Sequence, residues 1–80
     1  MNGQSVTYII VELQTYENGT VGTIVTQKDN YDEAQSVYHS TLAAAAVSTL
    51  PCHAAAILNN RGNIVENKYF VHEKEPEQNI

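Results

Sequence analysis

The chain has 80 residues, a net charge of −5 and one cysteine. A chain of this length forms one small domain with a marginal core, which natural proteins often reinforce with a disulfide, a metal or a partner subunit. Because Cys52 has no second cysteine to pair with, a disulfide within the chain is excluded. We therefore expect a homodimer or a higher oligomer.

The charge balance argues against nucleic acid as a partner, and the hydropathy argues against a membrane. Nine acidic residues stand against four basic ones, too few for the basic stripe that binds phosphate backbones. No apolar run is long enough to cross a bilayer, and residues 1–5 lack the basic start of a secretory signal. We expect a cytoplasmic protein, and the unpaired cysteine agrees with a reducing compartment.

Two segments rich in β-branched residues, 6–15 and 20–26, flank Asn18-Gly19 and predict a β-hairpin. A two-residue type I′ turn at Asn18-Gly19 pairs Leu13 with Ile24 and Glu12 with Val25. The two faces then carry, respectively, Ile9, Val11, Leu13 and Ile24, and Tyr8, Ile10, Tyr16, Val21 and Val25. One helix covers only one face of a small sheet, so we expect the second of these faces to stay uncovered within the monomer.

A helix is predicted from Tyr31 to about Ser48. Asn30 can cap it with Glu33 three residues later, and Pro51 prevents its continuation. A rotation of about 100° per residue predicts a core stripe of Ala34, Val37, Tyr38, Thr41, Leu42 and Ala45. The opposite side of the second half is small and apolar. We predict an oligomer interface made of Ile10, Val25, Ala43, Ala46 and Val47.

Residues 53–59 and 64–72 predict a second hairpin with its turn at Asn60-Arg61-Gly62. Gly62 suits the left-handed position of a three-residue loop, whereas a two-residue loop at Arg61-Gly62 would shift the register. The order β-β-α-β-β predicts an α+β domain over residues 1–72, in which two hairpins form a four-stranded antiparallel sheet and one helix packs on one face. Residues 73–80 are charged and contain Pro76, which is typical of a mobile tail.

No combination of residues predicts catalysis, a metal or a cofactor. Cys52 and His53 are adjacent in a strand and point to opposite faces, so they do not form a nucleophile–base pair. His39, His53 and His72 lie on three elements without the spacing of a zinc motif. Glu12 and Glu66 lie in mid-strand, where we expect them to face solvent. We expect a protein that is not an enzyme.

Tyrosines are the richest recognition groups, because each offers contact area and one hydrogen bond. The cations of the second hairpin could bind a phosphate. The predicted ligand-binding residues are Tyr8, Tyr16, Arg61, Lys68 and Tyr69.

The segments YIIVELQT, NGTVG and QSVYHSTLAAAAVSTLPCHAAAIL resemble a group of short uncharacterised proteins of bacteriophages and integrated mobile elements of Gram-positive bacteria. The likeness covers about residues 8–72. It implies an accessory protein that counters host defence, with an oligomeric sponge for a small nucleotide immune signal as the leading expectation. The alternatives are a protein inhibitor of a host defence enzyme and a virion-associated structural accessory protein.

Overall fold

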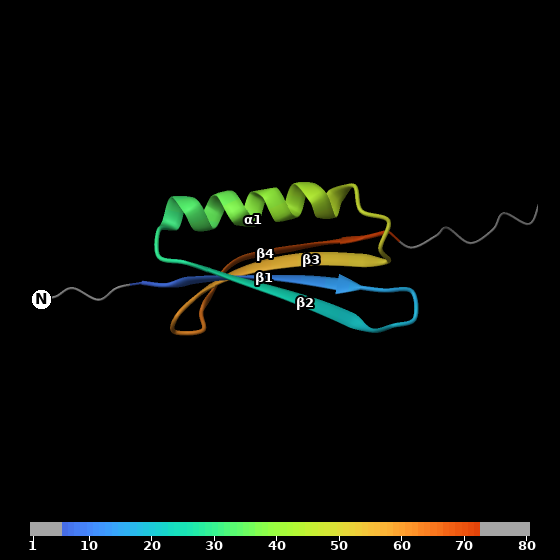
Figure 1. The fold of residues 1–80 in the computed structure, drawn as a ribbon, viewed down its shortest axis with the longest axis horizontal. Coiled ribbons are helices and arrows are strands. Elements are labelled where there is room, and N and C mark those ends of the chain that lie inside the picture. The colour runs from blue at the N-terminus through green and yellow to red at the C-terminus, as the bar shows by residue number, and fades with distance from the viewer. Residues whose placement is uncertain (1–5, 73–80) are drawn as a thin grey trace, which may run out of the picture.

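The computed structural model describes residues 6–72 and confirms the predicted α+β architecture (Figure 1). The elements in chain order are β1 (Tyr8–Thr15), β2 (Val21–Lys28), α1 (Tyr31–Ala46), β3 (Cys52–Asn59) and β4 (Ile64–Val71). The strands form one antiparallel sheet in the order β2-β1-β3-β4, and α1 lies across one face of it. The predicted tail, residues 73–80, lies outside the described residues.

The first hairpin forms where expected, but its predicted register is wrong by one residue. Leu13 pairs with Thr23 and Glu12 with Ile24. The loop has three residues because the Tyr16 amide bonds to the Thr20 carbonyl at 2.8 Å and the Gly19 amide bonds to the Tyr16 carbonyl at 2.9 Å. Gly19 occupies the left-handed region, with φ of 91°. The extra loop residue moves every β2 side chain to the other face, because strand side chains alternate.

The second hairpin uses the same kind of loop, which confirms the three-residue alternative. The Asn59 amide bonds to the Asn63 carbonyl and the Gly62 amide to the Asn59 carbonyl, both at 3.0 Å. Gly62 has a φ of 85°, which favours glycine. The β3–β4 register shifts between Ile57 and Leu58, so that Ile57 pairs with Glu66 and Leu58 with Ile64.

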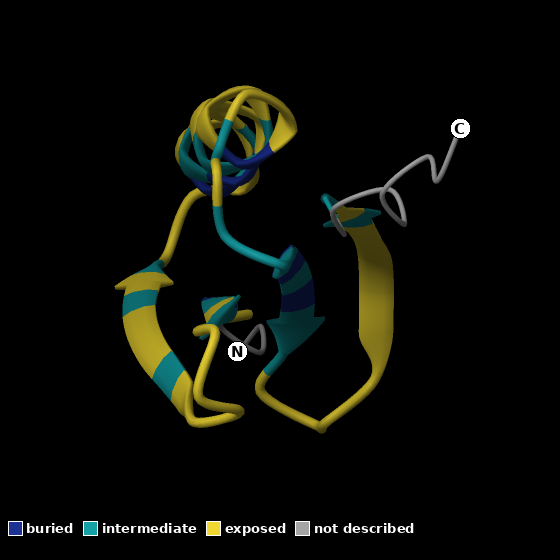
Figure 2. Ribbon diagram, turned by 90° about the vertical axis from the view of Figure 1, so that its right-hand side faces the viewer, coloured by how far each residue is buried: buried dark blue, intermediate teal, exposed yellow. Residues whose placement is uncertain are grey.

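The helix has the predicted cap and core stripe. The Asn30 side chain accepts a hydrogen bond from the Glu33 amide at 3.0 Å, and the helix ends at Ala46, close to the predicted end. Ala34, Tyr38 and Ala45 are buried, while Val37 and Leu42 pack beside the core. Ala34 and Tyr38 form one cluster with Ile10, Ala55 and Ile57 of the two central strands, and Val37 and Leu42 pack against it. Figure 2 shows that burial concentrates where the helix lies over β3.

The helix covers the face opposite to the one expected. Ile10 is 2% exposed beneath α1, so its predicted place in an oligomer interface is wrong. The uncovered side, which we name the open face, includes Val25 but not Ile10, because Val25 pairs with Val11 in the observed register. The open face consists of Ile9, Val11, Leu13, Thr15, Val21, Thr23, Val25, Gln27, Cys52, Ala54, Ala56, Leu58, Ile64, Asn67, Tyr69 and Val71.

Truncation of the central core residue tests this packing. Ile57 has no exposed surface, so Ile57→Ala should lower the free energy of unfolding by about 2–5 kcal/mol. Leu42→Ala, at a half-buried position, should lower it by less. Urea denaturation of both variants measures the difference. An equal loss at the two positions would contradict the observed orientation of the sheet.

Candidate functional site

A row of polar side chains lies on the helix-facing side of the sheet and ends in a buried histidine. The Tyr16 hydroxyl donates to Gln14 Oε1 at 2.8 Å, and Gln14 Nε2 donates to Glu12 Oε2 at 2.9 Å. The same Glu12 oxygen lies 2.6 Å from His53 Nε2. Gly22 makes room for this row, because a Cβ there would lie 3.0 Å from the Tyr16 hydroxyl. Gln14 Nε2 and His53 Nε2 therefore converge on one carboxylate oxygen.

The sequence analysis missed this arrangement, and its expectation that Glu12 faces solvent is wrong. The Glu12 side chain is 18% exposed and the His53 side chain 6% exposed. Side chains alternate along β1, so Glu12 lies on the same face as Ile10. Knowing that the helix covers Ile10 would therefore have placed Glu12 beneath the helix as well. The β1–β3 register, in which Gln14 pairs with His53, supplies the missing partner.

The single cysteine of the chain does not lie beside the Glu12–His53 pair. Cys52 and His53 point to opposite faces of the sheet, as predicted. Cys52 lies on the open face, while His53 is buried on the helix-facing side. His53 Nδ1 is buried without a hydrogen-bond partner, which is a cost to folding that the Glu12 contact offsets only in part. A structural role for the pair is the simplest account of this geometry.

The other two histidines each contact a backbone carbonyl of the helix. His39 Nδ1 lies 2.8 Å from the Gln35 carbonyl on the helix surface. His72 Nε2 lies 2.9 Å from the Ala45 carbonyl and ties the end of β4 to the last turn of α1. Within residues 6–72 no group of three or more histidine, cysteine, aspartate or glutamate side chains is placed to hold a metal ion.

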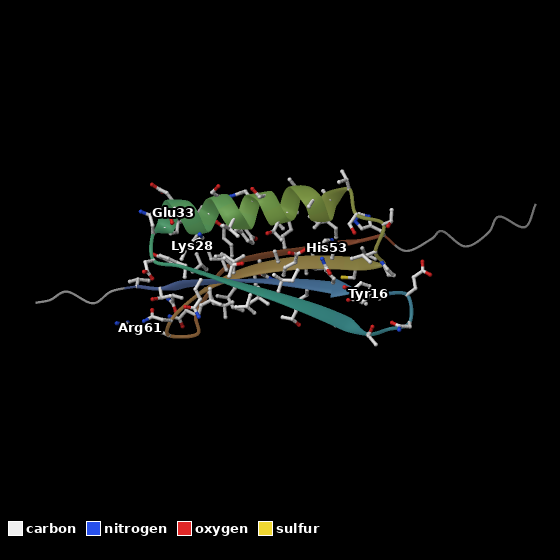
Figure 3. The ribbon with its side chains drawn as sticks, in the orientation of Figure 1. Tyr16, Lys28, Glu33, His53 and Arg61 are labelled. Carbon is white, nitrogen blue, oxygen red and sulfur yellow. The ribbon has the colours of Figure 1, made fainter. Side chains whose placement is uncertain are left out.

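Aromatic and basic residues lie at the opposite end of the sheet from His53 and Tyr16. The rings of Tyr8 and Tyr31 pack edge to face with their centroids 5.4 Å apart. Tyr8 pairs with Lys28 on one side and with Asn59 on the other. Arg61 lies in the loop that follows Asn59, and Figure 3 shows Lys28 and Arg61 at the same end of the molecule. We name Tyr8, Lys28, Tyr31 and Arg61 the aromatic–basic end.

The remaining predicted ligand-binding residues lie elsewhere. Tyr16 is at the other end of the sheet from Arg61 (Figure 3). Lys68 is in mid-strand on the helix-facing side, with Nζ 5.5 Å from the centre of the Phe70 ring. Tyr69 is on the open face and 65% exposed. One chain therefore brings Tyr8 and Arg61 to the same end and leaves the other three residues apart.

The predicted interface residues other than Ile10 are at the surface. Ala43, Ala46 and Val47 are exposed on α1 and at its end, and Val25 is exposed on the open face. These residues belong to two separate surfaces, because α1 covers the side of the sheet opposite to Val25.

One titratable group in the core has a shifted pKa. Burial raises the pKa of the Tyr38 phenol above 10.0, and the negative charge of Glu66 on β4 adds to the increase. Both effects disfavour the phenolate, so Tyr38 stays neutral over the physiological pH range.

Comparison with protein-family models, with curated proteins and with solved structures finds no match to this chain. Within residues 6–72, no helix has the length and apolar character needed to cross a membrane.

The coupling between Glu12 and His53 can be measured with a double-mutant cycle. Glu12→Leu and His53→Leu should each lower the free energy of unfolding by about 1–3 kcal/mol, because each leaves a buried polar partner unpaired. The double variant should cost less than the sum by about 0.5–3 kcal/mol. Glu17→Leu, in the exposed first loop, is the control partner for His53→Leu. Additivity in both pairs would show that the contact is energetically silent.

Alkaline pH tests the environment of Tyr38. Its raised folded-state pKa stabilises the fold below the ordinary tyrosine pKa of 10.0, and this contribution is lost as pH rises through the folded-state value. The native chain should therefore lose stability above that pH, and Tyr38→Phe should lose less. Tyr69→Phe, at an exposed tyrosine, is the control. Equal losses in all three proteins, measured by urea unfolding across a pH series, would contradict the assignment.

Proposed function

We propose that this chain is a non-enzymatic binding protein that acts as an assembly of identical copies and sequesters a small nucleotide. In biological terms, the proposal is an accessory protein of a phage or mobile element that removes a nucleotide signal used in host defence. The sequence resemblance supports the origin, and the aromatic–basic end supports the ligand class. The observation that carries the proposal is the packing of Tyr8 against Tyr31 at the end of the sheet that also holds Lys28 and Arg61.

The chemistry of this end suits a nucleotide better than a neutral metabolite. Tyrosine rings offer faces and edges on which a base can stack, together with hydroxyl groups for hydrogen bonds. Arginine presents a planar fork of donors that matches phosphate oxygens, and lysine supplies a point charge. The acidic residues Asp29, Asp32 and Glu33 are also near the start of α1, so a phosphate must approach from the side of the two cations.

Calorimetry against cyclic nucleotides and ADP-ribose derivatives tests the proposal. Arg61→Ala should weaken binding of the active ligand by about 1.5–3 kcal/mol, the usual loss for a charged hydrogen bond, without unfolding the protein. Lys68→Ala is the matched control, because it removes the same charge in mid-strand, beside Phe70.

The outcomes separate the alternatives. A larger loss for Lys68→Ala than for Arg61→Ala would move the pocket away from the aromatic–basic end. An absence of heat with every ligand, from a folded protein, would overturn nucleotide binding. Two alternatives would then remain: a protein inhibitor of a host defence enzyme and a virion-associated structural accessory protein. The acidic charge of the chain suits the inhibitor, because it can mimic the charge of nucleic acid.

A further inference from the structure

We propose that the open face of the sheet is the contact surface between two copies of this chain, packed sheet against sheet. This dimer differs from the interface predicted from the sequence. Of the five residues predicted for that interface, only Val25 belongs to the open face. The inference concerns how copies meet. Of the proposed function, the assembly of identical copies rests on this inference, whereas nucleotide binding at the aromatic–basic end is tested separately by calorimetry.

The distribution of charge on the strands favours a second copy as the occupant. The strands contain four charged side chains, Glu12, Lys28, Glu66 and Lys68, and all four lie on the helix-facing side. The open face therefore holds none. Two copies that each carry a net charge of −5 repel one another, so they approach most favourably through a surface without charge. A basic partner protein would instead be attracted to the acidic surfaces elsewhere on the chain.

The open face is also apolar at well-exposed positions. Val21, Val25 and Val71 are each more than half exposed, and Leu13 on the central strand β1 is 38% exposed. The polar members of the face, among them Thr15 and Asn67, carry uncharged side chains that can bond at the rim of an interface. In a sheet with one solvated face, polar residues on that face usually alternate along each strand with apolar residues on the core face. Here the strands carry many apolar residues on both faces.

The plan area of the face reaches the lower limit for a specific dimer. Four strands about 4.8 Å apart and eight residues long, at about 3.3 Å per residue, give a plan area of about 500 Å². Two such faces total about 1,000 Å², which is the lower limit for a specific interface. This plan area does not include the additional surface of the protruding side chains. Sheets that pack in this way lie about 10 Å apart with their strands within about 30° of each other. The two helices would then form the outer layers of the dimer.

Two neighbouring residues on the edge strand β2 provide a matched test. Val25 is on the open face and 56% exposed, whereas Ile24 is on the helix-facing side and 49% exposed. Val25→Lys should weaken dimerisation by about 100-fold or more, because it buries an unpaired charge in the contact. Ile24→Lys should leave dimerisation unchanged. Each substitution reduces the net negative charge of the chain, so general repulsion cannot explain a loss of association.

Light scattering and sedimentation across a micromolar concentration series measure the result, with circular dichroism as the check on folding. The native chain should have twice the monomer mass of 8.8 kDa, and high salt should not dissociate it, because the contact contains no ion pairs. Leu13→Lys provides a second disruption from a central strand. Native mass near 8.8 kDa at every concentration would overturn the dimer. A different contact surface would be indicated if Val25→Lys and Leu13→Lys still associate while Ile24→Lys or Val47→Lys does not. That result would overturn the proposal that the open face is the dimer interface.

Discussion

The pairing of β1 with β3 at the centre of the sheet places Ile10 directly opposite Ile57, and the other features of the fold depend on this pair. Both side chains are buried against Tyr38 and Ala34 of the helix. Because side chains alternate along a strand, fixing Ile10 beneath the helix also fixes Glu12 beneath it and sends Val11 to the other side. The polar row and the open face are thus two results of one register. A slip of a single residue would bury Val11 in place of Ile10 and expose the Glu12 carboxylate to solvent.

The first hairpin shows why local turn signals did not determine the faces of the sheet. Asn18-Gly19 correctly identified a turn, but the dipeptide fits either a two-residue loop or the last two positions of a three-residue loop. The structure uses the second arrangement, in which Asn18 Oδ1 accepts from the Thr20 amide at 3.0 Å and from the Thr20 hydroxyl at 2.7 Å. The face that the helix covers depends on contacts that are distant in the sequence, because Ile10 is buried against Ile57 and the helix. By contrast, the helix was predictable from local information, since Asn30 and the spacing of Ala34, Tyr38 and Ala45 lie within one segment.

The sequence predicted the types of residue in the candidate site better than their positions in the fold. Tyrosines and the few cations were identified as recognition groups, and Tyr8 and Arg61 do lie at the same end of the sheet. Tyr31 and Lys28 were not included, because the first follows a loop and the second lies at the end of β2, and only the sheet order brings them beside Tyr8. Lys68 and Tyr69 lie on opposite faces because they are adjacent in a strand, whereas the end of the sheet at which Tyr16 lies depends on how the two hairpins pair. Their separation follows from the antiparallel register, which depends on tertiary packing.

The sheet order β2-β1-β3-β4 also determines how the chain reaches its folded state. The two hairpins and the helix are local in sequence, and isolated elements of these kinds form in about 0.1–10 μs. The β1–β3 ladder joins segments on either side of the helix, so it closes a long loop and forms late, because loop-closure entropy must be overcome first. Until that closure, each two-stranded hairpin is marginally stable and exposes the unpaired edge of a central strand. The hydrogen-bonding groups of β1 are therefore most vulnerable to pairing with the wrong chain during synthesis, because β1 is made before its partner β3.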